Sequence, residues 1–268
     1  MISKSLKRIY IALILIFMYA PIITLIVLSF NASKTRSKWG GFTLDWYVEL
    51  FHNEEIMGAL LNTLIVAFLS ALIATIIGLI GCITMQNAGK KVRGIISGIT
   101  NIPMLNAEIV TGISMMLLFL SFGNILAKLG VRWQLGFITV LISHITFNIP
   151  YTMLSILPRM KQLNPSVYEA ALDLGATKAT AFRKVVLPDL MPGISSGFLM
   201  AFTMSIDDFI ITHFTKGPGF DTLSTKIYTE LRKGIKPEMY ALSTLIFIAV
   251  FILLLLINHT PKENKPKR

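Results

Sequence analysis

The chain of 268 residues has few charged residues and a single cysteine. Charged residues make up 15% of it, against about 25% in soluble domains, whereas hydrophobic residues reach 54%. So few charges cannot cover a water-soluble domain of this size, so the composition indicates a protein of the lipid bilayer. Cys82 alone excludes an intramolecular disulfide and a cysteine-based metal cluster. The four histidines are scattered and show no metal-ligand spacing.

The sequence also lacks a phosphate-binding loop of the type Gly-x-x-x-x-Gly-Lys-Ser/Thr. Its nearest fragment, Gly89-Lys90-Lys91, has Thr84 at the position of the first glycine and Lys91 at the position of the Ser or Thr. We therefore expect that the chain is not an enzyme that hydrolyses ATP and that it holds no cofactor or metal. If ATP drives its activity, a separate subunit must bind the ATP and the magnesium.

Long apolar runs are the dominant feature that the sequence does contain. Each is about as long as the roughly 20 residues that a helix needs to cross the hydrocarbon. Backbone polar groups in lipid must bond internally, so these runs are predicted to be helices. The first is too long for the core of a signal peptide, so we expect it to be retained. The predicted fold is therefore an all-α polytopic membrane protein with six transmembrane helices: Ile9–Phe30, Ala59–Met85, Ile102–Phe122, Gly136–Leu157, Ile194–Phe214 and Ala241–Ile257.

The distribution of basic residues predicts the orientation of these helices. If the N-terminus is cytoplasmic, the inside segments hold 15 Lys and Arg residues and the outside segments hold 10, over similar total lengths. Cytoplasmic loops carry the excess of Lys and Arg, so both termini are expected inside.

The longest inside loop, residues 158–193, shows the pattern of a short helix. Asn164 suits the N-cap and Pro165 suits the first turn. Gly175 fits the position that follows the last turn. The apolar stripe between them has the spacing i, i+3, i+4 and i+7 and consists of Val167, Ala170, Ala171 and Leu174.

A second short helix is expected to start near Thr177 and to end at Leu187-Pro188, because proline blocks its continuation. The small residues at the centre of this helix–turn–helix allow another protein's surface to approach closely. The alternative interpretation is a loop that packs against the ends of the spans.

The order of residues in this loop resembles the EAA loop of permeases that serve binding-protein-dependent ABC (ATP-binding cassette) importers. Three residues separate Glu169-Ala170-Ala171 from Gly175, and Val185 stands where that family usually has isoleucine, followed by Leu187-Pro188. The resemblance implies a type I ABC importer permease fold. It also implies that this loop docks on an ATP-hydrolysing subunit through Glu169, Ala170, Ala171 and Gly175, with Leu187 and Pro188 completing the motif.

Three acidic residues fall within or near the predicted spans: Glu108, Asp207 and Asp208. A carboxylate in hydrocarbon costs about 2.5–3.5 kcal/mol, so each is expected to face a cavity or a partner. The spans contain no Lys or Arg to pair with them. One interpretation is a negatively charged path for a cation; the other is that the acids lie near helix ends or are protonated. His144 and Asn148, spaced i, i+4, share a helix face and favour an interhelical hydrogen bond.

The run 202–209, Phe-Thr-Met-Ser-Ile-Asp-Asp-Phe, is similar to the equivalent helix of spermidine/putrescine permeases, and the run 41–47 is similar to that group as well. Polyamines are long cations that need spaced carboxylates, and aromatic rings for cation–π contact. Asp45, Trp46 and Tyr47 are candidate contacts at the outer mouth. For the two aromatic residues, an interfacial belt is the alternative.

The resemblance implies a permease subunit that translocates polyamines across the bacterial plasma membrane. Residues 1–58 would hold the first helix and an outer loop, residues 59–257 the permease domain, and residues 258–268 a basic cytoplasmic tail. The implied partners are ATP-binding subunits, a second permease subunit and an extracytoplasmic polyamine-binding protein. Permeases for ferric iron or thiamine share the coupling loop and remain alternatives. Two other classes are a proton-coupled secondary transporter and a membrane scaffold.

Overall fold

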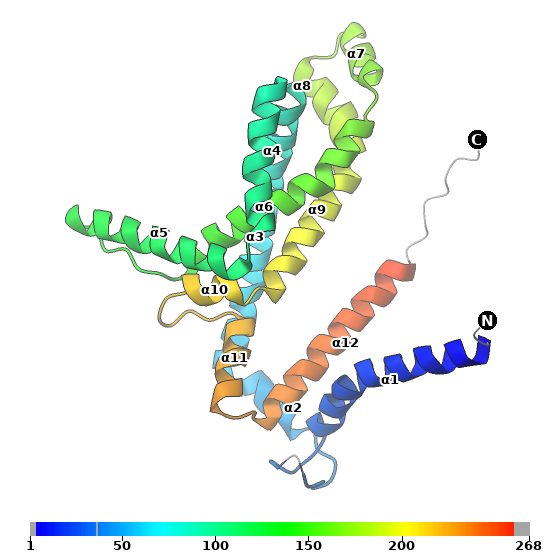
Figure 1. Cartoon of the computed structure of the whole chain (residues 1–268), viewed down its shortest axis with the longest axis vertical. Helices are drawn as coiled ribbons and strands as arrows, with labels where there is room; N and C mark the ends of the chain where they lie inside the picture. The colour runs from blue at the N-terminus through cyan, green and yellow to red at the C-terminus, as the bar shows by residue number, and fades with distance from the viewer. Residues whose placement is uncertain (1–3, 36, 260–268) are drawn as a thin grey trace. The chain divides into compact units, whose positions relative to one another are not determined.

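The computed structural model describes residues 4–35 and 37–259, and this part of the chain is almost entirely helical (Figure 1). Its β structure is one isolated bridge between Asn31 and Phe42. Contacts divide the chain into two compact units, Met1–Met57 with Ile227–Arg268, and Gly58–Lys226. Most of the basic tail predicted at residues 258–268 lies outside the described residues.

The first unit contains the long helices at the two ends of the chain, and both pack on neighbours within it. Helix α12 contacts α1 and the short helix α2. The bounds of these helices are α1 Lys4–Ser29, α2 Asp45–His52 and α12 Pro237–His259.

The second unit is built around the pair α6 and α9, which run side by side (Figure 1). Helix α3 packs on α6, and α10 packs on α5. Helix α11 begins at the end of this unit and continues into the other. The bounds are α3 Glu54–Asn87, α4 Lys90–Leu105, α5 Glu108–Lys128, α6 Phe137–Gln162, α7 Pro165–Asp173, α8 Lys178–Ala181, a π-helical turn Phe182–Val186, α9 Leu187–Asp207, α10 Ile210–Thr215 and α11 Leu223–Lys233.

Within the described residues, five helices are long and apolar enough to cross a membrane, and a shorter apolar stretch, Pro237–Ile248, makes a sixth. This confirms the predicted class. Two predicted spans differ in detail. Ile102–Phe122 is interrupted at Asn106 and Ala107, where α4 ends and α5 begins, and Ile194–Phe214 is interrupted after Asp207. Hydropathy measures apolar content over a window, so it passes over a change of backbone direction that involves only two residues.

Close approach of α3 and α6 depends on Gly78. A methyl group at this position would meet the side chain of Thr152, whose hydroxyl proton is shared between the carbonyls of Ile149 (2.8 Å) and Ala74 (3.1 Å). About one turn further along, α3 and α6 share a buried apolar cluster that includes Cys82, Met153 and Ile156. Glycine at position 78 therefore lets a hydrogen-bonded threonine sit against the α3 backbone.

We expect Gly78→Ala to destabilise the protein by about 1–3 kcal/mol, the usual cost of overpacking a core. The matched control is Gly98→Ala, on α4, where an added methyl group meets nothing within 4 Å. That change should be neutral or slightly stabilising, since alanine is the better helix former. Thermal unfolding of the two purified variants in the same detergent measures the difference. Equal melting temperatures would contradict a close helix contact at Gly78.

The helix–turn–helix predicted in residues 158–193 is present. Asn164 caps α7 by accepting a hydrogen bond from the amide of Ser166 (3.1 Å), and Thr177 caps α8 in the same manner through the amide of Thr180 (3.2 Å). Gly175 follows α7 with a φ of +86°, the left-handed conformation that favours glycine.

The predicted end of the second helix at Leu187-Pro188 is wrong. Helix α8 passes through the π-helical turn Phe182–Val186 directly into α9, with Pro188 in the first turn of α9. A proline inside a regular α-helix clashes with the carbonyl four residues earlier. The wider π turn changes the hydrogen-bond register just before Pro188, so the chain stays helical there.

Candidate cation cavity and coupling surface

The three acidic residues predicted in the spans line a single cavity of about 430 Å³ in the second unit. This volume lies in the range of small-molecule sites, about 300–1,000 Å³. Among the described residues, its lining is Glu108, Phe147, Thr203, Met204, Asp207, Asp208, Phe209 and Ile210. Residues that are a hundred positions apart in the sequence therefore meet at one site.

Helix ends position the carboxylates of this cavity. Glu108 is the first residue of α5, and Asp207 is the last residue of α9. A carboxylate is favoured at a helix N-terminus, whereas at a C-terminus it adds to the negative end of the helix dipole. The region around Asp207 therefore combines a carboxylate with free carbonyl groups, which makes it attractive to a cation. The alternative considered for the acids, a place near helix ends, is compatible with their lining a cavity.

The two adjacent aspartates differ in their surroundings. Asp207 is exposed, whereas the side chain of Asp208 is only 4% exposed. The Asp208 carboxylate accepts hydrogen bonds from the backbone amides of Ile211 (3.2 Å) and Thr212 (2.8 Å), and so caps the first turn of α10. Asp208 is thus engaged by the protein, whereas Asp207 and Glu108 are exposed residues of the cavity lining.

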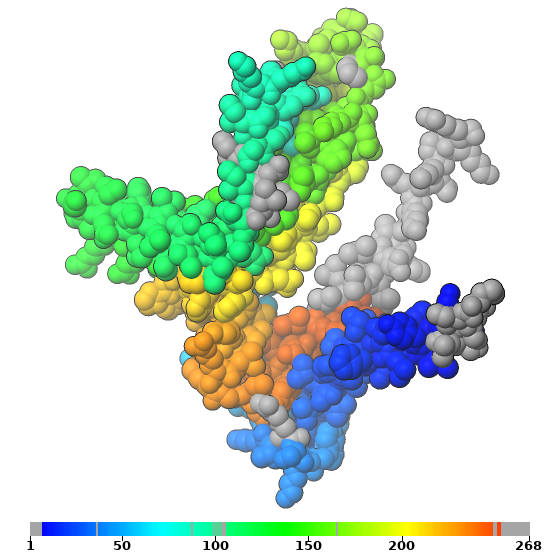
Figure 2. Space-filling model, in the orientation of Figure 1, coloured from blue at the N-terminus to red at the C-terminus, as the bar shows by residue number. Residues whose placement is uncertain are grey.

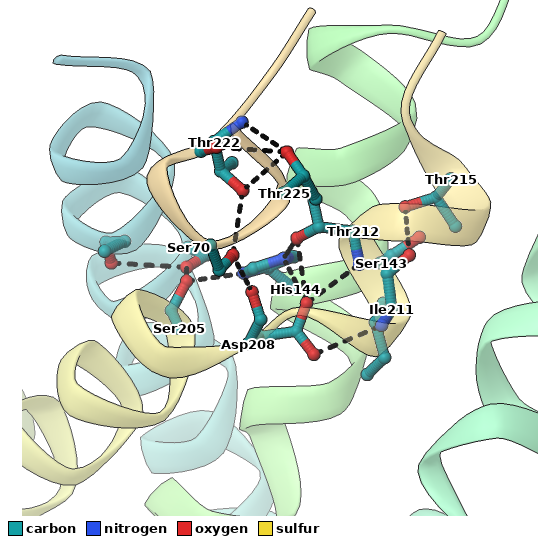
Figure 3. A network of polar contacts seen from close by, with 12 residues as sticks. Ser70, Ser143, His144, Ser205, Asp208, Ile211, Thr212, Thr215, Thr222 and Thr225 are labelled. Carbon is teal, nitrogen blue, oxygen red and sulfur yellow. Dashed lines mark hydrogen bonds and ion pairs between the residues drawn. The ribbon is translucent and has the colours of Figure 1, made fainter. Parts of the chain in front are cut away.

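His144 is the ionisable partner of Asp208, and sequence reasoning missed it by considering only Lys and Arg. Its Nε2 lies 3.3 Å from Asp208 Oδ2 and 2.8 Å from the hydroxyl of Thr212 (Figure 3). The other ring nitrogen lies 2.5 Å from the hydroxyl of Ser205. The predicted interhelical role of His144 is confirmed, because its partners lie on α9 and α10.

Asn148, one turn further along α6, completes the polar contacts between α6 and α3. Its amide donates to the hydroxyl of Ser70 (3.3 Å). The Ser70 hydroxyl also lies 3.1 Å from Ser205 Oγ (Figure 3). All of these side chains are buried. Buried polar groups need such partners, so the network holds α3, α6, α9 and α10 in one arrangement beside the cavity.

Two aromatic rings also line the cavity. Phe147 on α6 is 4% exposed, and Phe209 follows Asp208 in the link to α10. Aromatic faces attract ammonium groups, most strongly where water is excluded. Carboxylates beside aromatic rings suit a flexible cation with several ammonium groups and would repel an anion.

The three candidate residues of the outer mouth have different environments in the first unit. The Trp46 side chain is 8% exposed, and its indole N–H donates to the carbonyl of Asn31 (2.8 Å). The Tyr47 hydroxyl is hydrogen-bonded to that of Ser29 (2.7 Å). Both aromatic side chains therefore pack against the end of α1 and the loop that follows it, with Trp46 buried and Tyr47 half-buried. Asp45, at the start of α2, is exposed.

The EAA-loop residues form a small exposed surface. In Figure 2 this part of the chain is the yellow-green end of the second unit. Glu169 and Ala170 are exposed, Ala171 is half-buried, and Leu174 is 89% exposed. Val167, of the same predicted stripe, is 50% exposed, so α7 presents two apolar side chains to solvent and is a candidate docking surface. The sequence placed Leu174 in the predicted apolar stripe of this helix. That its side chain is exposed is seen only in the structure.

The last two motif positions, Leu187 and Pro188, lie at the start of α9. Leu187 is half-buried and Pro188 is exposed. A cavity of about 320 Å³ lies between α7 and the π-helical turn, and its lining includes Glu169, Val185 and Asp189. The motif thus joins the exposed helix α7 to the beginning of a long span.

Residues 74–260 match a protein family described as "Binding-protein-dependent transport system inner membrane component". The spermidine/putrescine transport system permease protein PotC of Escherichia coli (strain K12) is 34% identical over 255 residues, 95% of this chain and 93% of the relative. The putrescine transport system permease protein PotI of the same strain is 37% identical over 238 residues, 88% of this chain and 83% of the relative.

Solved structures with the same fold belong to bacterial ABC transporters. A transporter that imports the acidic polysaccharide alginate aligns with a TM-score of 0.70 at 21% identity, over 95% of this chain and 93% of the other. The inward-facing methionine transporter MetNI aligns with a TM-score of 0.57 at 18% identity, over 77% and 95% of the two chains. At these identities the likeness shows the fold.

Proposed function

The chain belongs to the family of binding-protein-dependent transport system inner membrane components, and from this premise we propose that it is the permease subunit through which an ABC importer moves polyamines across the plasma membrane. The curated relatives described above carry spermidine or putrescine. The observation that supports the same substrate class here is the cavity shared by Glu108, Asp207 and two phenylalanines.

The proposed assembly contains a second permease subunit, two ATP-binding subunits and an extracytoplasmic polyamine-binding protein. ATP and magnesium belong to the ATP-binding subunits, and this chain holds no cofactor. Both termini are cytoplasmic, which places α7 on the side of the ATP-binding subunits. Glu169, Ala170, Ala171 and Gly175 form the surface that docks there, and Leu187 and Pro188 connect it to α9.

In this proposal, closure of the ATP-binding subunits moves α7, and the π-helical turn passes the motion to α9. Helix α9 ends at Asp207, so a shift of α9 changes the acid-lined cavity itself. A cation held by Glu108 and Asp207 on the outer side is then released inward. The driving force comes from the ATP-binding subunits, and the cavity supplies selectivity for the cation.

Uptake by the reconstituted complex tests this function. In proteoliposomes with the binding protein outside and ATP inside, we expect accumulation of labelled spermidine or putrescine, and competition by the other polyamine. Ferric iron, thiamine and sulfate at equal concentration should not compete. Transport of ferric iron or thiamine in place of polyamines would overturn the substrate assignment. Polyamine uptake driven by a proton gradient, without ATP or the binding protein, would overturn the importer mechanism.

A further inference from the structure

The hydrogen bonds around His144 can be assigned a direction by counting protons. The hydroxyl of Thr212 has one proton, which it donates to Asp208 Oδ2 (2.8 Å). The hydroxyl oxygen of Thr212 lies 2.8 Å from Nε2 of His144, so the ring nitrogen must be the donor in that contact. Nε2 of His144 therefore carries a proton.

The opposite side of the ring leads to the same kind of conclusion. The hydroxyl of Ser70 donates its proton to the carbonyl of Ala67 (3.2 Å), so it acts as an acceptor toward Ser205. Ser205 then donates its single proton to Ser70 and has none left for Nδ1 of His144, 2.5 Å away. With the Ser70 proton on the Ala67 carbonyl, the contacts of Ser205 and His144 are all satisfied when Nδ1 is a donor as well.

We infer that His144 is an imidazolium that forms a buried ion pair with Asp208 and, as a positioning residue, keeps Asp208 out of the substrate's path. Asp208 is the charged group that contacts the His144 ring. The other partners of the ring are the hydroxyls of Ser205 on α9 and Thr212 on α10. The ring is 2% and the carboxylate 4% exposed, where an unpaired charge would be costly.

The consequence for transport is that the adjacent residues Asp207 and Asp208 have different roles. Asp208 is neutralised by His144 and caps α10, so it contributes no net charge to the cavity. Glu108 and Asp207 supply the negative charge that a cation meets. His144 fixes the break between α9 and α10 at which Asp207 is presented, and so acts on the substrate through the backbone rather than by contact.

Nitrogen NMR of the histidine-labelled complex in lipid tests the protonation state directly, without depending on the transported substrate. When only this chain carries the histidine label, replacing its other three histidines with glutamine (His52, His213 and His259) leaves His144 as the sole signal. We expect protons on both ring nitrogens. A ring with one unprotonated nitrogen would overturn the inference, whatever the complex transports.

A charge-balance experiment tests the positioning role and rests on the proposed function. His144→Gln and Asp208→Asn should each lower polyamine uptake by about tenfold or more, because each leaves one buried charge without its partner. The double variant removes both charges and keeps polar side chains, so we expect uptake to recover to within about threefold of wild type. If the loss of uptake in the double variant equalled the combined losses of the two single variants, the ion pair would be refuted. Absence of polyamine uptake by the wild-type complex would instead contradict the proposed function.

Discussion

Replacing Gly175 with valine should lower ATP-driven uptake by about tenfold or more while leaving the protein inserted in the membrane. The residue has a φ of +86°, and nothing lies within 4 Å of an added methyl group. The expected effect is therefore conformational: a left-handed backbone costs an L-residue about 1–2 kcal/mol, and β-branched residues tolerate it least. The turn between α7 and α8 would rearrange, and Glu169 and Ala170 would leave the position proposed for docking.

The measurements are co-purification of the ATP-binding subunit and uptake into proteoliposomes, for which we expect losses of about tenfold or more in both, since each 1.4 kcal/mol is a factor of ten. Gly89→Val is the matched control, because Gly89 has a φ of −63° and equally open surroundings. Gly175→Asn should retain more activity than the valine variant, since asparagine accepts a left-handed conformation more readily. Normal co-purification and uptake with valine at position 175 would refute the coupling assignment.

Removing the charge of Asp207 should raise the substrate concentration needed for half-maximal uptake by roughly 10- to 100-fold. A hydrogen bond to a charged group contributes about 1.5–3 kcal/mol. Asp207 is exposed at the C-terminus of α9, and within the described residues no backbone amide donates to it as Thr212 does to Asp208. We expect a similar change for Glu108→Gln and a larger one for the double variant. Concentration-dependent uptake of labelled spermidine and putrescine measures each effect.

Glu49→Gln, an exposed acid of α2 in the first unit, is the control for a general change in surface charge and should leave uptake unaffected. Purified complexes of all variants should contain the ATP-binding subunit in normal amounts, since the cavity and the exposed surface of α7 are formed by different residues. If the double variant of Glu108 and Asp207 transported polyamines like the wild type, the cavity would not be the cation site.

Several features of this protein could be read from local patterns of residues. Apolar runs of about 20 residues predict spanning helices, because the backbone in lipid has no other way to satisfy its polar groups. The caps at Asn164 and Thr177 and the left-handed Gly175 follow from side-chain and backbone preferences that act within a few residues. The resemblance to a permease family rests on the same short stretch.

The sequence by itself therefore determined the helical membrane class, the helix–turn–helix and the acids suited to a cation. Only the tertiary structure decided that Glu108 and Asp207 share a cavity, that Asp208 is paired with His144, and that Trp46 is a packing residue. The physical reason is range: caps and hydropathy depend on neighbours along the chain, whereas ion pairs and cavities depend on which helix ends meet. The π-helical turn before Pro188 belongs with the second group, since a proline rule that assumes a regular helix cannot anticipate a wider turn.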